Sequence, residues 1–213
     1  GNPSLEPESG INFDTGLKFR STKFAGSVSY FNNTYKNLLS NEEVGIINGT
    51  PVTIPNGLFQ TTNIGRARIQ GFEADVEVPI KLGLGFLTPS GNISYLRGDD
   101  LESNEPLTTI TPLKTVFNLR WQNFLNNYYV DWTTRVVNKQ DRLSSAFLTV
   151  NGGAEPGFAV SDLGGGFTVK REKYRLSFNI GTKNIFNRLY NEQFVFAPAR
   201  GRSFVFGTTW DIN

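Results

Sequence analysis

The chain of 213 residues contains no cysteine, no histidine and no methionine. These absences remove the usual protein ligands of zinc, haem and copper, together with nucleophiles and bases built on a thiol or an imidazole. Glu73 and Asp75 share a strand face, but that spacing alone does not make a glycosidase site. The acidic stretch from Asp99 to Glu105 lacks EF-hand spacing, so a solvated loop is the simpler interpretation. We therefore expect no enzyme, no cofactor and no metal site.

Long hydrophobic runs and a strong excess of one charge are also missing. The apolar stretches are only a few residues long, whereas a membrane-spanning helix needs roughly 20. The net charge is +2 and the charged residues are spread along the chain, so we expect no nucleic-acid partner. The chain has no initiating Met and no signal peptide before Asn2, so we interpret Gly1 as a cloning scar on an excised segment.

The residues that are present alternate between apolar and polar with period two. The content of 38% hydrophobic and 13% aromatic residues is enough to bury a substantial surface. Turn signals divide the alternation into about nine strands and leave no convincing amphipathic helix. The expected strands are Ile11 to Arg20, Phe24 to Leu39, Gln60 to Val78, Leu84 to Arg97, Leu113 to Phe124, Tyr128 to Asp141, Phe158 to Lys170, Tyr174 to Asn187, and Arg202 to Ile212.

The links between these strands alternate in length. Short links are expected at Ser21 to Lys23, Pro79 to Gly83, Leu125 to Asn127 and Arg171 to Lys173. Long links rich in Gly, Pro, Asn and Ser are expected at Ser40 to Phe59, Gly98 to Pro112, Arg142 to Gly157 and Arg188 to Gly201. Short turns at one end and long loops at the other are typical of outer-membrane β-barrels. Strands longer than the usual 5 to 6 residues fit the same interpretation.

Each expected strand has an apolar face and a polar face. Inward charges of both signs suit a water-filled or plugged lumen better than a dry core. The alternation predicts that these charged side chains face the lumen: Glu73, Asp75, Glu77, Arg120, Arg135 and Arg175. A β-sandwich with one solvated face per sheet predicts a similar alternation and remains an alternative.

Four sequence motifs resemble TonB-dependent outer-membrane receptors. They are the run Asn184 to Tyr190, the closing segment from Gly201 to Gly207, the strand Asn63 to Ala74 with Gly71 and Glu73, and the strand Leu113 to Trp121. The fold class that this resemblance implies is all-β, an antiparallel up-and-down transmembrane β-barrel. Residues 1–213 would form the C-terminal part of that barrel, without the plug domain and the N-terminal strands.

The resemblance also implies a location and partners. The intact protein would lie in the outer membrane of a Gram-negative bacterium, in contact with lipid and lipopolysaccharide. It would take up a scarce nutrient, most plausibly a ferric siderophore, with energy from the TonB complex acting on the absent N-terminal part. The last strand resembles the signal read by the barrel-assembly machinery, at Gly207, Trp210 and Ile212. The family often ends in an aromatic residue, and Ile212 followed by Asn213 departs from that pattern.

Polar and aromatic residues near the loop end are the candidates for ligand binding. They are Asn63, Arg66, Arg68, Arg97, Arg142, Tyr190 and Arg200. Arginine suits an anionic chelate because its planar guanidinium makes paired hydrogen bonds. The same side chains could instead solvate loops or bind lipopolysaccharide phosphates. Two other functions remain open: a standalone outer-membrane porin, and a soluble β-sandwich for adhesion or carbohydrate binding.

Overall fold

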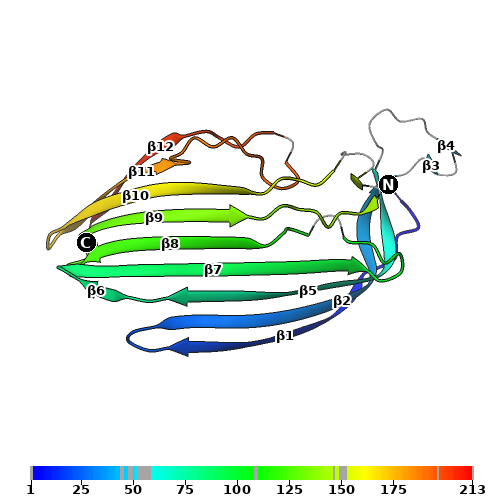
Figure 1. Cartoon of the computed structure of the whole chain (residues 1–213), viewed down its shortest axis with the longest axis horizontal. Coiled ribbons are helices and arrows are strands. Elements are labelled where there is room, and N and C mark those ends of the chain that lie inside the picture. Colours follow the sequence, from blue (N-terminus) through cyan, green and yellow to red (C-terminus); the bar gives the residue numbers. More distant parts are fainter. Residues whose placement is uncertain are drawn as a thin grey trace.

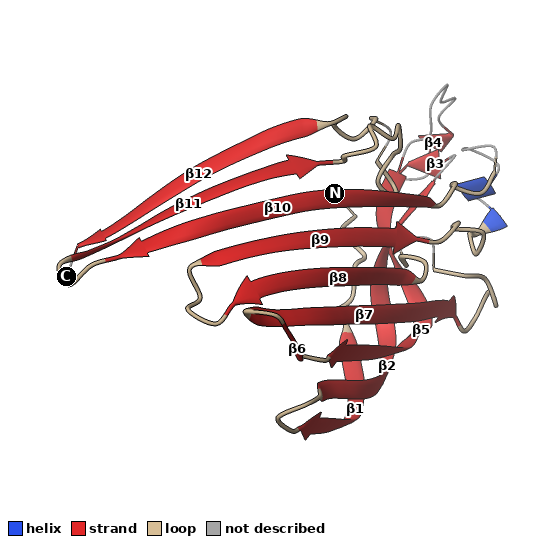
Figure 2. Ribbon diagram, turned by 60° about the vertical axis from the view of Figure 1, so that its left-hand side comes forward, coloured by secondary structure: helices blue, strands red, loops and turns tan. Residues whose placement is uncertain are grey.

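The computed structural model describes residues 2–43, 46–47, 50–51, 59–107, 110–145, 147–148, 153–195 and 197–212. Nearly all regular structure in this part of the chain is β-strand (Figures 1 and 2). The strands are β1 (Ser9–Arg20), β2 (Ala25–Glu43), β3 (Ile46–Ile47), β4 (Thr50–Pro51), β5 (Phe59–Glu77), β6 (Ile80–Leu82), β7 (Gly85–Asp100), β8 (Lys114–Asn123), β9 (Tyr128–Val137), β10 (Phe158–Lys170), β11 (Tyr174–Lys183) and β12 (Ser203–Ile212).

One sheet contains ten of these strands. Nine follow each other in the order β1-β2-β5-β7-β8-β9-β10-β11-β12, and short β6 pairs with β7. Every neighbouring pair is antiparallel, so the chain runs up and down without a crossover. The predicted all-β, up-and-down architecture with about nine long strands is confirmed. A β-sandwich is excluded for the described residues, because they form no second sheet that faces the first.

Most predicted strand boundaries agree with the structure to within a few residues, and two strands end earlier than predicted. β9 ends at Val137 rather than Asp141, because Asn138 N–H then bonds to Leu113 and Gln140 bridges to Glu155. β11 ends at Lys183 rather than Asn187, because Asn184 and Asn187 have positive φ values of 50° and 52°. The left-handed backbone at these two asparagines cannot continue a strand.

The strand register separates two faces. Glu73, Asp75 and Glu77 on β5 share one face with Arg120 on β8, Arg135 on β9 and Arg175 on β11. We call this the polar face. The opposite face, called the apolar face, carries Leu17, Val28, Ala74, Ile93, Phe117, Trp132, Leu163, Ile180 and Phe206. Predicting the faces from alternation alone works because side chains alternate strictly along a strand.

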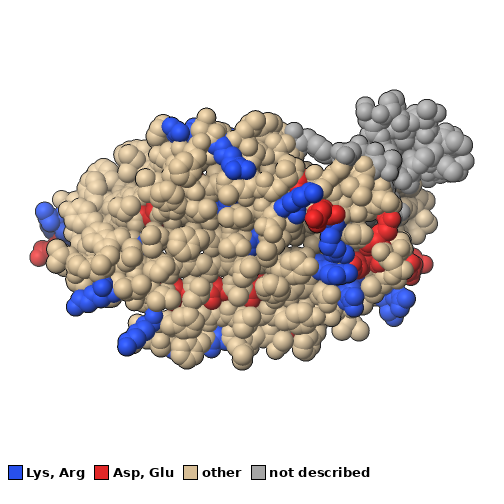
Figure 3. Space-filling view, viewed as in Figure 1, with Lys and Arg blue, Asp and Glu red and all other residues tan. Residues whose placement is uncertain are grey.

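The apolar side chains are largely open to the surroundings. Leu17, Phe204 and Phe206 are 76%, 79% and 71% exposed. The chain exposes 14367 Å², whereas a compact protein of this mass exposes roughly 9,800 Å². Figure 3 shows a face that is mostly uncharged in its middle, with most of its Lys and Arg towards the two ends of the sheet. A single layer with so much exposed apolar surface requires another apolar medium on that face.

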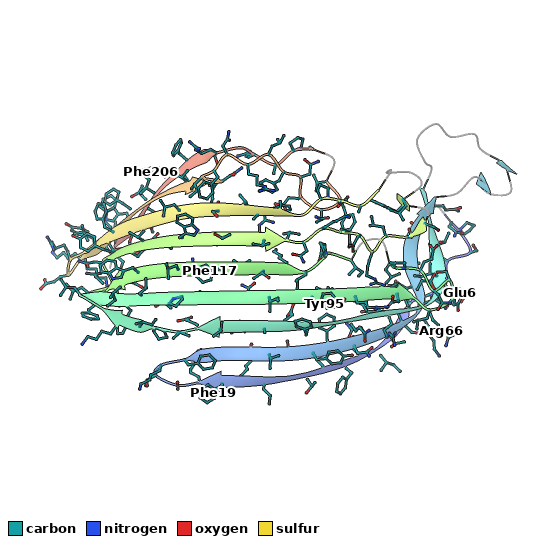
Figure 4. The ribbon with its side chains drawn as sticks, in the orientation of Figure 1. Glu6, Phe19, Arg66, Tyr95, Phe117 and Phe206 are labelled. Carbon is teal, nitrogen blue, oxygen red and sulfur yellow. The ribbon has the colours of Figure 1, made fainter. Side chains whose placement is uncertain are left out.

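Aromatic residues mark the short-turn end of the sheet. The rings of Phe19 and Phe24 lie 5.5 Å apart across the first turn, and those of Phe86 and Phe124 lie 5.3 Å apart. Figure 4 shows Phe19 near this end and Phe117 further along. Among the described residues, no helix is long and apolar enough to cross a membrane.

Candidate functional site

The motif from Asn184 to Tyr190 shapes the loop between β11 and β12. Asn184 is 3% exposed and has the left-handed backbone that Asn tolerates. Its side-chain oxygen accepts a bond from Arg188 N at 2.8 Å, and its side-chain nitrogen donates to the carbonyls of Arg188 and Arg200 at 2.8 and 3.2 Å. One buried amide therefore joins the beginning and the end of this loop.

Two further contacts hold the loop base. Asp162 on β10 accepts bonds from Asn184 N and from Lys183 Nζ, each at 2.9 Å. Asn187 accepts a bond from Arg202 N at 2.9 Å. The role of the motif's two asparagines is therefore to fold the chain, and it leaves their side-chain amides with little capacity for a ligand.

The same loop is fastened to the polar face by Glu192 and Tyr190. Arg135 donates both terminal nitrogens to the Glu192 carboxylate, one of them at 2.8 Å, and donates to Tyr190 Oη at 3.4 Å. The Tyr190 ring lies 4.4 Å from the Phe158 ring, and the Arg135 guanidinium lies 4.9 Å from the Phe158 centroid. Phe158 is one of the few buried apolar residues, at 5% exposure. This bidentate pair combined with ring stacking is more specific than a simple surface ion pair.

Charge pairing affects the titration of the loop carboxylate. The hydrogen bonds from Arg135 hold the pKa of Glu192 below its usual value, against a smaller opposing effect of burial. Glu192 therefore stays ionised, and the loop stays fastened, below the pH at which an ordinary glutamate becomes protonated.

A cavity of about 490 Å³ lies between this loop and the polar face of the sheet. Its lining comes from β8, β9, β10, the end of β11, the loop and β12: Val116, Thr133, Arg135, Val160, Asp162, Lys183, Asn184, Tyr190, Arg200, Gly201, Ser203 and Val205. The volume falls in the range of roughly 300–1,000 Å³ that small-molecule sites occupy.

The charges around the cavity are unequally balanced. Arg135 is paired with Glu192, and Lys183 is paired with Asp162. Within the described part of the chain, Arg200 lines the cavity without an ion pair. The Arg200 carbonyl is fixed by Asn184 while its side chain is exposed, so a guanidinium is available to an anionic ligand.

The seven candidate ligand-binding residues do not form one site. Tyr190 and Arg200 line the cavity just described. Asn63 instead accepts a bond from Glu6 N at 2.8 Å and donates to the carbonyls of Glu6 and Asn37 at 3.0 and 2.7 Å. Its amide braces the N-terminal segment against the β2–β5 hairpin.

Arg66, Arg68 and Arg97 lie on the apolar side of the sheet. Counting along β5 from Phe72 and Ala74, the residues on the same face are Arg68 and Arg66, and Arg97 pairs with Gln70 of that face. Arg142 reaches Asp99 at 2.6 Å, and Arg97 reaches the same carboxylate at 2.9 Å. Arg142 also borders a smaller cavity of about 290 Å³, together with Tyr95 and Gln140. For all seven residues, ligand binding stays a prediction.

The remaining predicted site residues are placed as follows. The six charged residues expected in the lumen share the polar face, and that this face borders a lumen stays a prediction. On β12, Trp210 and Ile212 lie on the apolar face and Gly207 on the polar face. Gly1 and Asn213 lie outside the described residues. Among the described side chains, no group of three His, Cys, Asp or Glu could hold a metal ion.

Sequence reasoning missed Glu192 and Asp162. Both take part in the site only because the loop folds back on the sheet, which the strand pattern does not encode. A weak signal existed for Glu192, since it lies two residues after Tyr190 in a loop otherwise rich in basic residues.

Three comparisons with known proteins agree with this architecture. The family described as TonB dependent receptor-like, beta-barrel matches residues 1–185. The ferric enterobactin receptor of Pseudomonas aeruginosa is 24% identical over 206 residues, which is 88% of this chain and 26% of that protein. The ferrienterobactin receptor of Escherichia coli is 27% identical over 123 residues, covering 57% of this chain and 16% of that protein.

Solved structures show the same fold. The copper transporter OprC superimposes with a TM-score of 0.77 at 22% identity, covering 99% of this chain and 32% of that one. The FrpB iron transporter of Neisseria meningitidis gives 0.70 at 20% identity, covering 96% of this chain and 31% of that one. An antiparallel sheet with an exposed apolar face and a polar face is what a segment of such a barrel requires. The chain belongs to the TonB-dependent receptor β-barrel family, and it spans less than a third of the length of either enterobactin receptor.

Proposed function

We propose that this chain is part of an outer-membrane receptor that takes up a ferric siderophore in a TonB-dependent way. The observation that carries the proposal is the cavity on the polar face, where Arg200 is unpaired beside Tyr190 and the paired Arg135. An aromatic ring and a free guanidinium suit an anionic aromatic chelate, because one stacks and the other makes charge-assisted hydrogen bonds. Relatives named as ferric enterobactin receptors support this class of ligand.

The partners follow from the same proposal. TonB would act through a part of the receptor outside this chain, and the charged polar face would line the route of the ligand. Gly207, Trp210 and Ile212 on β12 would present the final strand to the barrel-assembly machinery. A relative named as a hemin receptor is 25% identical over 231 residues, but this chain has no histidine to supply as a haem ligand.

The test uses the full-length protein encoded by the gene. Deleting the gene should abolish growth on a ferric catecholate as sole iron source, and should leave growth on ferrous iron unchanged. Unchanged growth on every ferric siderophore tried would refute the uptake function.

Binding to the purified receptor tests the cavity. Arg200→Ala should weaken binding of the ferric catecholate about tenfold, the effect of losing one charge-assisted contact. Arg202→Ala is the matched control, since Arg202 is exposed nearby but does not line the cavity. Equal affinities for the two variants would remove Arg200 from the site while leaving the uptake result standing.

A further inference from the structure

A group of basic residues lies on the apolar face, beyond the last aromatic row at the loop end. Successive rows of the register there read Tyr30, Phe72 and Tyr95, then Asn32, Gln70 and Arg97, then Thr34, Arg68 and Asp99, and finally Lys36 with Arg66. The Phe72 and Tyr95 rings lie 5.5 Å apart. Figure 4 shows Phe117, Tyr95 and Arg66 in this order along the sheet towards the loop end.

The aromatic row marks the boundary of the apolar band. Trp and Tyr favour the interface between the hydrocarbon and the headgroups. Rows on one face are about 7 Å apart along the strands. The basic residues therefore lie roughly 7 to 20 Å beyond the aromatic row, at the depth of the polar headgroups.

The basic residues here lack acidic partners in the described part of the chain. Lys36, Arg66 and Arg68 make no ion pair there, and Arg68 Nε has no hydrogen-bond partner. Arg97 and Arg142 share the single carboxylate of Asp99. These five cations and one carboxylate leave a net positive charge on this patch.

Nearby acids are already engaged. Glu6 accepts a bond from the Asn37 side chain at 2.9 Å, and Glu8 accepts one from Leu39 N at 2.7 Å. Asp100 belongs to the other face and accepts a bond from Glu102 N at 2.8 Å. The basic side chains on the apolar side are thus left facing outwards, where a lumen ligand could not reach them.

We propose that Lys36, Arg66, Arg68 and Arg97 form a docking surface for the phosphate groups of an anionic lipid in the outer leaflet. The apolar band below would contact the acyl chains, and the guanidinium groups would bind the headgroup phosphates in pairs. This inference rests on the proposed outer-membrane location, but it is independent of the siderophore. It assigns to lipid three arginines that the sequence places among the candidates for ligand binding.

The test measures binding of diphosphoryl lipid A to the full-length receptor in detergent micelles, after removal of co-purified lipid. The triple variant Lys36→Gln, Arg66→Gln and Arg68→Gln should bind lipid A about a hundredfold more weakly, since each basic residue near an anionic lipid surface contributes roughly fivefold. The control variant Lys23→Gln, Arg171→Gln and Lys173→Gln removes the same charge from exposed positions at the short-turn end. It should bind like the wild type.

Three arms make the result decisive. Lipid A without phosphates should bind weakly to the wild-type protein, and raised salt should weaken the binding of the diphosphoryl form. Inorganic phosphate at the same concentration should not displace lipid A; displacement would point to a site for free phosphate and overturn the proposal. The charge-preserving variant Arg66→Lys and Arg68→Lys should recover most of the affinity, which separates a charge effect from misfolding.

Equal lipid A binding by the glutamine triple variant and the wild type would overturn the proposal. Siderophore uptake serves as the separate readout for the proposed function. A receptor that transports no siderophore but loses lipid A binding in the triple variant would refute only the function, whereas the opposite pattern would refute only the lipid surface.

Discussion

A single carboxylate holds the loop between β11 and β12 against the sheet. Glu192 binds Arg135 and lies next to Tyr190, whose ring covers Phe158. Because Arg135 lowers the pKa of Glu192 below 4.5, the contact is fully formed at neutral pH. It should be lost only as the pH falls through this lowered pKa. The side chain of Glu192 is 42% exposed, so solvent screening limits its contribution to about 1 kcal/mol.

Amide hydrogen exchange can detect this contact. Protection of Ala199 N–H, which bonds to the Tyr190 carbonyl at 2.8 Å, should persist below pH 4.5 and then fall, after correction for intrinsic exchange. In Glu192→Gln the protection should be roughly fivefold lower at neutral pH and should lose its acid dependence. Glu172→Gln, in an exposed short turn, is the control and should behave like the wild type. Wild-type protection in Glu192→Gln would show that the ion pair does not hold the loop.

The arginines show what alternation can and cannot reveal about single residues. Counting backwards by two from Phe72 reaches Gln70, Arg68 and Arg66, so the sequence contains the signal that these arginines share the apolar side. Grouping them by closeness to the loop end hides that signal. The contact of Arg135 with Glu192 has no comparable signal, because it depends on how a loop of irregular backbone returns to the sheet.

At the scale of the strands, Gly71 on β5 has a specific steric role. From the sequence, a glycine here would let the strand flex or let lumen contents approach its backbone. In the structure, a Cβ at Gly71 would meet the Phe31 ring of β2 and the Tyr95 carbonyl of β7. The glycine therefore makes room for its own neighbours in the sheet. Gly181 on β11 lies on the same face, and a Cβ there would meet its nearest atom, the Leu163 carbonyl, at an ordinary 3.4 Å.

Gly71→Ala should therefore destabilise the barrel by about 1–3 kcal/mol, the usual cost of overpacking. Gly181→Ala should be neutral or slightly stabilising, because alanine restricts the unfolded chain. The midpoint of thermal unfolding in detergent, followed by the loss of β-structure, compares the two variants. Equal midpoints would mean that the sheet adjusts at Gly71 and that the glycine is not required for packing.

The strand pattern predicts the elements better than their ends. Period-two alternation identifies all nine long strands, because every one has an apolar face that extends over most of its length. The pattern fails at the ends of β9 and β11, where polar residues continue the alternation but bond to loops instead of neighbouring strands. Short β6 also escapes it, since three residues are too few to establish a period.

At the scale of the molecule, the sheet is one layer thick and has different surroundings on its two faces. Side chains as exposed as Leu17 and Phe206 would be unfavourable in water, and the charged residues of the polar face would be unfavourable in hydrocarbon. A membrane on one side and an aqueous lumen on the other satisfies both faces at once. A soluble protein with this sheet would have to cover the apolar face with a second layer.

Nitroxide labels at single cysteines distinguish these two situations cleanly, because the chain has no native cysteine. Labels at Val76 and Phe206 on the apolar face should collide more often with dissolved oxygen, which concentrates in lipid, than with a water-soluble nickel chelate. Labels at the adjacent residues Asp75 and Val205 on the polar face should show the reverse preference. The preference should alternate with every residue along β5 and β12 when the full-length protein is in lipid bilayers. If the apolar-face labels were instead shielded from both reagents, that face would be covered by protein, and the membrane-facing assignment would be wrong.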